Sequence, residues 1–328
     1  MTRRVAITDR AWPMKEPFAI SRGVSTQQRV IIVEIEDEAG RRGRGEACGI
    51  PYAGETPETM ITALAPVLPA IEAGATREDL LGLLPPGGAR CAVDCALWDL
   101  EAKASGAPAW ARAGLTLFSP VDTCYTIGIR DLDGYERKAN ELRAFAWLKV
   151  KVGQGDPLPA ITAVRRGSPQ ARLVVDPNQA WSPDDLKAYA GPLADLGVAV
   201  LEQPIPVGAE AALDGYRCPI ALAADELIGD ERDLDRARGR FDIVNIKLDK
   251  TGGLTTALRL ADVAQEHGFA LMVGCMAGSS LSMAPAMIIA QRCAVVDLDG
   301  PLLQAEDWAD GLVYTAGRVA PPAPTFWG

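Results

Sequence analysis

The stretch LVVDPNQAWSPDDLKAYAGPLADLGVAVLE, residues 173–202, contains two short apolar runs with a helical segment between them. Each run, 173–176 and 198–202, is apolar until it ends in a carboxylate, which is typical of a strand buried on both faces. Ser182-Pro183 indicates a helix start, because a capping serine is commonly followed by proline in the first turn. The order strand, helix, strand predicts one unit of a parallel sheet.

The same unit recurs from the middle of the chain onward. The predicted strands cover residues 124–127, 147–152, 173–176, 198–202, 220–224, 243–247, 270–274 and 295–298. Amphipathic helices are predicted between these strands. Eight strands joined by helical crossovers within about 180 residues predict a closed parallel α/β barrel rather than an open sheet.

The segment before the barrel is predicted to be an antiparallel sheet followed by helices. The β-branched run 30–36 and a second strand through 44–47 can pair across a turn. Gly40, Gly43 and Gly45 are interpreted as turn residues, since no helix follows them to complete a phosphate cradle. A helix with one buried stripe is then predicted from the spacing of Cys91, Cys95, Trp98 and Ala102.

The composition disfavours two classes of binding partner and favours one cellular compartment. The 328 residues include 33 Lys plus Arg and 43 Asp plus Glu, a formal net charge of −10, which disfavours nucleic acid and anionic membranes. Seven cysteines without a CxxC pair, and no export signal at the start, favour a reducing cytoplasm. The uncharged stretch 268–291 is broken by glycine and proline and is predicted to be a strand, loop and helix. Both a monomer and a homo-oligomer are compatible with the sequence.

Three consecutive predicted strands supply carboxylates at their carboxyl ends, namely Asp176, Glu202 and Asp225. They would repel one another if uncompensated, and a divalent cation resolves that repulsion. Oxygen ligands without cysteine or histidine suit a hard ion, Mg²⁺ before Mn²⁺. The single histidine, His267, is predicted to lie at a helix end away from this site.

Lysines and a second acidic pair complete the predicted mouth of the barrel. Strands two and six of an eight-strand ring are opposed, so Lys151 and Lys247 would flank a substrate from opposite sides. Strands four and eight are also opposed, so Asp297 and Asp299 would face the metal and bind a cationic group of the substrate. One lysine would remove an α-proton and the other would return a proton to the opposite face, while the metal and Lys149 stabilise the enediolate.

A lysine that acts as base must be neutral. Nearby Mg²⁺ and neighbouring ammonium groups disfavour the charged form, so we expect a lowered lysine pKa at this site.

Several stretches resemble the enolase superfamily, in its muconate-lactonising subgroup, and in particular its dipeptide epimerases. They are Leu148-Lys-Val-Lys151, Val174-Val-Asp-Pro-Asn178, Leu201-Glu-Gln-Pro204, Ala223-Ala-Asp-Glu226, Asn245-Ile-Lys247, Lys250-Thr-Gly-Gly-Leu254 and Val296-Asp-Leu-Asp-Gly300. A lysine base with Mg²⁺ is the known chemistry of such sites. The resemblance implies a modified TIM barrel, (β/α)₇β, spanning residues 119–300. It also implies an α+β capping domain at 1–118, against which the tail 301–328 packs.

The resemblance further implies a dipeptide substrate of the L-Ala-D/L-Glu class from murein peptides, whose amino terminus Asp297 and Asp299 would hold. Family members that act on acidic second residues tend to carry a cation in the loop 20–24, where Arg22 is the candidate. The sequence leaves open an acidic or an apolar second residue. It also leaves open N-succinylamino acid racemisation, o-succinylbenzoate synthesis and, in another class, a non-catalytic metal-binding barrel.

Overall fold

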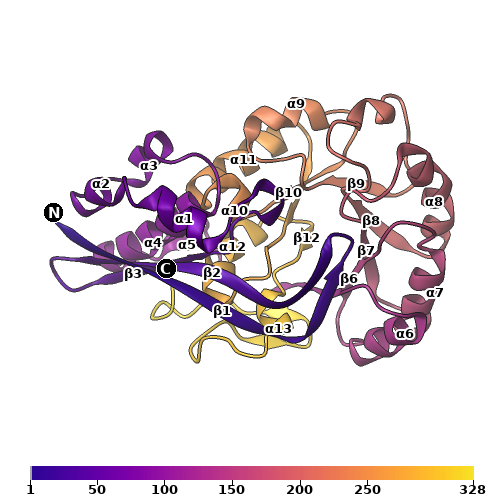
Figure 1. Cartoon of the computed structure of the whole chain (residues 1–328), viewed down its shortest axis with the longest axis horizontal. Helices are drawn as coiled ribbons and strands as arrows, with labels where there is room; N and C mark the ends of the chain where they lie inside the picture. Colours follow the sequence, from indigo (N-terminus) through magenta and orange to yellow (C-terminus); the bar gives the residue numbers. More distant parts are fainter. Residues whose placement is uncertain (1) are drawn as a thin grey trace.

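The structure, a computed structural model, describes residues 2–328 and consists of an elongated capping domain beside a barrel (Figure 1). The capping sheet is antiparallel, with the strand order β1 (Arg3–Ile20), β2 (Gly23–Asp37) and β3 (Arg42–Ala47). The run predicted as a strand over 30–36 forms the C-terminal half of β2, which contains its buried residues. The sequence pattern does not predict β1, because its residues are mostly half-buried or exposed and Pro13 interrupts the run.

The helices of the capping domain pack against this sheet, and the longest of them, α4 (Gly88–Ser105), covers β2 and β3. A Cβ atom at Gly45 would lie 2.1 Å from the carbonyl oxygen of Ala92, and one at Gly43 would lie 2.1 Å from that of Ala96. The interpretation of these two glycines as turn residues is therefore wrong, since they allow β3 and α4 to approach closely. The remaining elements are η1 (Pro51–Ala53), α1 (Pro57–Leu64), α2 (Leu68–Glu72), α3 (Arg77–Leu83) and α5 (Ala109–Arg112).

Eight parallel strands form the barrel, and the predicted fold class is confirmed. In order around the sheet they are β5 (Cys124–Ile127), β6 (Trp147–Lys151), β7 (Arg172–Asp176), β8 (Val198–Glu202), β9 (Ala221–Ala224), β10 (Ile243–Ile246), β11 (Ala270–Val273) and β12 (Val295–Val296). Side chains join the first and last strands: the Leu298 N–H donates to Thr123 Oγ1 at 2.9 Å, and the Thr126 N–H donates to Asp299 Oδ2 at 2.6 Å. The sheet is thus nearly closed.

Most crossovers between the strands are helices on the outside of the barrel (Figure 1). They are α6 (Leu132–Glu141), α7 (Leu158–Gly167), α8 (Pro183–Asp195), α9 (Leu234–Ala237) with η3 (Glu231–Asp233), α10 (Leu248–Thr251), α11 (Leu254–Glu266) and α12 (Ser280–Ala290). The crossover from β8 to β9 contains only the short η2 (Glu210–Leu213), where the predicted repeat would place an amphipathic helix.

The uncharged stretch 268–291 forms β11, a loop and α12, as predicted, and every residue of α12 is buried. None of the helices within residues 2–328 is long and apolar enough to cross a membrane.

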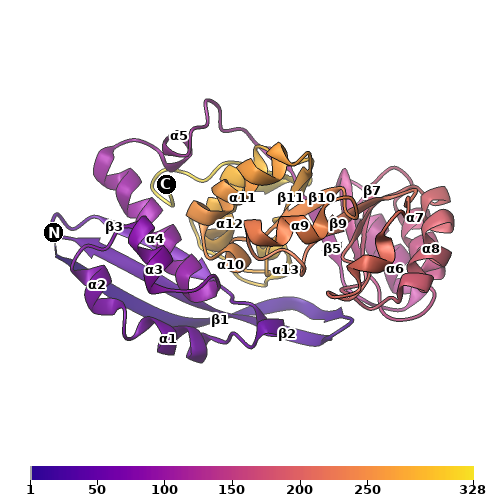
Figure 2. The same cartoon turned by 90° about the horizontal axis from the view of Figure 1, so that it is seen from above.

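The tail begins with α13 (Gly300–Leu303) and continues through β13 (Tyr314–Thr315) and β14 (Arg318–Val319), which pairs with β4 (Val121–Asp122). Its end lies on the capping domain: Trp327 Nε1 donates to the Arg44 carbonyl at 3.0 Å, and the Gly328 N–H donates to Asp99 Oδ1 at 2.8 Å. Figure 2 shows the β1–β2 hairpin reaching from the capping sheet along the barrel.

Candidate active site

A cavity of about 480 Å³ lies between the carboxyl ends of the barrel strands and the tip of the β1–β2 hairpin. Six predicted site residues line it: Lys149, Lys151, Lys247, Asp297, Asp299 and Arg22. The three carboxylates predicted to bind metal, Asp176, Glu202 and Asp225, are almost completely buried beneath it. The fold therefore brings all nine residues to one end of the barrel.

The strand order fixes where the two predicted acid–base lysines lie. Lys151 is the last residue of β6 and Lys247 directly follows β10. Three strands, β7 to β9, separate β6 from β10, so the two lysines come from opposed parts of an eight-strand ring. Both ammonium groups can therefore reach the same cavity from different sides.

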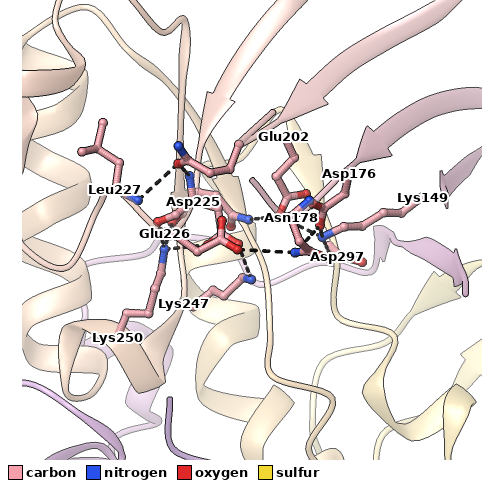
Figure 3. A network of polar contacts seen from close by, with 12 residues as sticks. Lys149, Asp176, Asn178, Glu202, Asp225, Glu226, Leu227, Lys247, Lys250 and Asp297 are labelled. Atoms are coloured by element: carbon pink, nitrogen blue, oxygen red, sulfur yellow. Dashed lines mark hydrogen bonds and ion pairs between the residues drawn. The ribbon is translucent and has the colours of Figure 1, made fainter. Parts of the chain in front are cut away.

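Each buried carboxylate contacts a lysine (Figure 3). Lys151 Nζ lies 2.5 Å from Asp176 Oδ2, and Lys247 Nζ lies 2.6 Å from Asp225 Oδ2. Lys149 Nζ lies 2.7 Å from Glu202 Oε2 and 3.2 Å from Asp176 Oδ2. The lysines thus compensate the negative charge that the carboxylates concentrate under the cavity.

This compensation reverses one expectation from the sequence. Burial lowers the pKa of Lys149, but Asp297 and Glu202 outweigh that effect and the pKa is raised well above its usual value. The pKa of Lys247 is also raised, because Asp225 outweighs its burial. The lowered pKa expected of a base lysine is therefore not found at Lys247, whereas Lys149 was expected to stay protonated. The expectation counted the cation and the neighbouring ammonium groups but not the carboxylate that each lysine contacts.

The pKa values of the buried carboxylates are shifted in opposite directions. Burial alone would raise the pKa of Asp176, yet Lys151 and Lys149 lower it to about 2. Burial and the charge of Asp176 raise the pKa of Glu202, against the effect of Lys149. Glu202 Oε2 accepts no hydrogen bond from any residue of 2–328, so its 2.7 Å approach to Lys149 Nζ is an ionic contact.

These residues suit a hard divalent cation. Adjacent strand ends supply three carboxylates, and Glu202 Oε2 makes an ionic contact with Lys149 but no hydrogen bond within residues 2–328. Among residues 2–328, no three acidic, cysteine or histidine side chains form a ready-made metal cluster, and Lys149 contacts both Asp176 and Glu202.

Three further buried residues donate hydrogen bonds to the carboxylates, one of them through its backbone N–H, and the sequence analysis missed them. The Asn178 N–H donates to Asp176 Oδ1 at 2.8 Å, Asn245 Nδ2 donates to Glu202 Oε1 at 3.0 Å, and Lys250 Nζ donates to Asp225 Oδ1 at 2.7 Å. All three lie in the stretches that carry the family resemblance. Asn245 could have been found, because it lies two positions before Lys247 and so shares its face of the strand.

Asp297 and Asp299 directly follow β12, the strand opposed to β8 in the eight-strand order. Asp297 Oδ2 lies 2.8 Å from Lys149 Nζ, so one lysine contacts both predicted acidic sites. Asp299 Oδ2 accepts the hydrogen bond from the Thr126 N–H, and burial together with the charge of Asp297 raises the pKa of Asp299 to about 7. The pair can accept hydrogen bonds from a cationic group in the cavity.

Arg22 lies at the turn of the β1–β2 hairpin and reaches the cavity. Its Nη1 donates to Glu226 Oε1 at 2.8 Å, and its guanidinium carbon lies 5.1 Å from the centre of the Tyr52 ring. Both Glu226 and Tyr52 were missed by the sequence analysis. His267, in contrast, ends α11 beside Arg238 and does not line the cavity.

Comparisons with known proteins agree with this architecture. Residues 134–324 match the family described as "Enolase C-terminal domain-like", and residues 2–114 match the "Mandelate racemase / muconate lactonizing enzyme, N-terminal domain". The chain belongs to the mandelate racemase and muconate-lactonising family of the enolase superfamily.

Relatives and solved structures add detail. The chain is 40% identical to the L-Ala-D/L-Glu epimerase of Escherichia coli (strain K12), over 97% of this chain and 99% of that one. It is also 40% identical to an N-acetyl-D-glutamate racemase from Pseudoalteromonas sp, over 76% and 79%.

A crystal structure of an Agrobacterium tumefaciens enolase family member with bound sodium and L-Ala-L-Glu superposes with a TM-score of 0.97 at 41% identity, covering 99% and 100%. A dipeptide epimerase from Enterococcus faecalis V583, complexed with Mg and L-Leu-L-Tyr, gives a TM-score of 0.90 at 27% identity, covering 98% and 97%.

Proposed function

We propose that this chain is an isomerase that inverts the α-carbon of the C-terminal residue of a dipeptide, of the L-Ala-D/L-Glu class, by two-base 1,1-proton transfer. The observation that carries the proposal is that Lys151 and Lys247 line one cavity from opposed strands. One lysine removes the α-proton from its face of the substrate. The other delivers a proton to the opposite face, so the configuration is inverted.

Asp176, Glu202 and Asp225 would hold Mg²⁺, with Mn²⁺ as a second choice, at the end of the cavity where β7, β8 and β9 finish. When bound, this ion supplies Lewis-acid polarisation of the substrate carboxylate, which acidifies the neighbouring α-proton. Lys149 remains protonated among its acidic neighbours, and its ammonium group stabilises the negative charge of the enediolate.

The remaining cavity residues bind the two ends of the dipeptide in this proposal. Asp297 and Asp299 accept hydrogen bonds from the substrate ammonium group, opposite the metal ligands. Arg22 faces the side chain of the second residue from the hairpin tip. The barrel thus supplies the chemistry, and the capping domain contacts the side chain that varies between substrates.

The second candidate function is racemisation of an N-acylated amino acid, the class to which N-succinylamino acids belong, or o-succinylbenzoate synthesis. The 40% identity to an N-acetyl-D-glutamate racemase favours the racemisation. These substrates lack the ammonium group that Asp297 and Asp299 would bind. Asp299→Asn therefore separates the two: it lowers kcat/KM for a dipeptide but not for an N-acylglutamate.

We infer that the substrates are dipeptides released from murein and that the chain works in the cytoplasm. Seven free cysteines among residues 2–328 support a reducing compartment. A homo-oligomer stays a prediction, which light scattering of the purified protein tests.

The deciding experiment is proton exchange in heavy water. The protein is incubated with Mg²⁺ and L-Ala-L-Glu, and NMR follows both the loss of the glutamate α-proton signal and the appearance of the L-Ala-D-Glu diastereomer. We expect both. N-succinylglutamate and N-acetylglutamate run in parallel, and exchange with either of these but with no dipeptide would establish the second candidate. Absence of exchange with every substrate would favour the non-catalytic barrel.

A further inference from the structure

Glu226 is a buried carboxylate that the proposed reaction does not use. Its side chain is 2% exposed, and Oε1 accepts a hydrogen bond from Arg22 Nη1 at 2.8 Å. The same oxygen accepts a second hydrogen bond from Asn178 Nδ2 at 3.4 Å (Figure 3). Its other oxygen, Oε2, is buried and has no hydrogen-bond partner within residues 2–328. Arg22 and Asn178 line the cavity whereas Glu226 does not, so its charge lies behind these two residues.

Glu226 is also the partner that orients Arg22. Across the part of the chain that the structure describes, the only hydrogen bond of the Arg22 guanidinium is the one to Glu226. Burial lowers the pKa of Arg22, but Glu226, Asp176 and Asp225 raise it, so the guanidinium stays charged. The remaining N–H groups can therefore bind a ligand carboxylate, although a negative charge stands directly behind them.

We propose that Glu226 determines side-chain specificity: it holds Arg22 at the edge of the cavity while its charge weakens the attraction of Arg22 for an acidic second residue. The inference rests on the proposed function, since it concerns the side chain of the dipeptide. A substrate carboxylate near Arg22 is attracted by the guanidinium and repelled by Glu226. Neither charge acts on a neutral side chain. The Arg22–Glu226 ion pair therefore reduces the difference in kcat/KM between acidic and neutral dipeptides.

Glu226→Gln isolates the charge from the geometry. Glutamine keeps an oxygen that can accept the hydrogen bond from Arg22 Nη1, but the negative charge behind the guanidinium is gone. The readout is the ratio of kcat/KM for L-Ala-L-Glu to kcat/KM for L-Ala-L-Gln, two substrates of almost the same size. Any effect of the substitution on metal binding or on the lysines changes both rates and cancels in the ratio.

We expect Glu226→Gln to raise this ratio by about tenfold, the effect of removing one like charge a few ångströms away at partial burial. An unchanged or lowered ratio would overturn the proposal. Glu210→Gln is the matched control, because Glu210 is also buried and paired with an arginine, Arg236 at 3.2 Å, but does not line the cavity. Its ratio should stay at the wild-type value.

A second variant tests the same charge if Glu226→Gln does not fold. In Arg22→Met the carboxylate of Glu226 is left without its counter-charge, so L-Ala-L-Glu should become the poorer substrate of the two. Equal kcat/KM values for both dipeptides in Arg22→Met would show that the charge of Glu226 does not act on the substrate. If the wild-type protein epimerises neither dipeptide, the proposed function itself fails, which is a different outcome from an unmoved ratio.

Discussion

Asp249 joins the two domains beside the cavity, and its substitution gives a prediction whose size follows from its contacts. It lies in α10, two residues after Lys247, and its Oδ1 accepts hydrogen bonds from the N–H groups of Cys48 at 2.8 Å and Gly49 at 2.9 Å. Those two residues precede the loop that carries Tyr52 to the cavity. Asp249→Ala leaves two buried N–H groups without an acceptor, at about 1–3 kcal/mol each.

We therefore expect Asp249→Ala to lower the free energy of unfolding by about 2–6 kcal/mol. Asp249→Asn keeps an oxygen that can accept both bonds, so its effect at low pH should be small. Urea unfolding followed by tryptophan fluorescence measures both variants. Asp133→Asn, an exposed change in the first turn of α6, serves as the control and should stay within about 0.5 kcal/mol of wild type.

The dependence on pH tests the physical reason. Burial raises the pKa of Asp249 from 3.8 to about 6, although the Cys48 and Gly49 N–H groups oppose the shift. The pKa of Asp249 is higher in the folded than in the unfolded protein. The contribution of Asp249 to stability is therefore complete below pH 3.8 and is lost as the pH rises through 6. Asparagine does not titrate. Between pH 4 and 7 the free energy of unfolding of Asp249→Asn should therefore rise relative to that of wild type by up to about 3 kcal/mol. A difference that is independent of pH, or that moves in favour of wild type, would refute this reasoning.

Three other predictions concern the reaction and the fold. Lys151→Met and Lys247→Met should each abolish epimerisation, yet each should retain α-proton exchange with only one epimer of the dipeptide; equal residual exchange with both epimers in either variant would contradict the two-sided assignment. Dialysis against EDTA should remove activity and lower the melting temperature, and Mg²⁺ at 100 times its Kd should restore about 2.7 kcal/mol of stability; full activity in chelator would exclude the metal site. Gly45→Ala should cost about 1–3 kcal/mol in urea unfolding, because the added Cβ would meet the Ala92 carbonyl at 2.1 Å; near-wild-type stability would show that β3 and α4 can move apart.

The barrel and its charged residues were predictable because they depend on local pattern. A strand buried on both faces is a short apolar run, and a charge at its carboxyl end is conspicuous there, as with Asp176 and Glu202. The predicted spans of β5 and β8 agree with the structure to the residue. Parallel order around a ring then fixes which strands are opposed, so the placement of Lys151 and Lys247 needed no knowledge of side-chain contacts.

The parts that escaped prediction depend on residues far apart in the chain. Arg22 and Glu226 are 204 positions apart, and neither residue alone indicates the other. Cys48 and Asp249 are 201 apart, and the bond between them uses a backbone N–H, which has no sequence signature. The shift in the Lys149 pKa depends on carboxylates at the ends of four other strands at once, so its direction could not be inferred from the lysine and the cation alone.

The division of the cavity between two domains explains how selectivity can change while the chemistry stays the same. The lysines and carboxylates proposed to act on the α-carbon all lie on barrel strands or directly after them, where parallel hydrogen bonding on both sides restricts movement. Arg22 lies on a hairpin tip and Tyr52 in the short η1 between two loops, where substitutions disturb fewer contacts. Glu226 is the exception, because it belongs to the barrel but contacts the hairpin. An altered preference between acidic and neutral dipeptides can therefore arise on either side of this one ion pair without moving the groups that transfer protons.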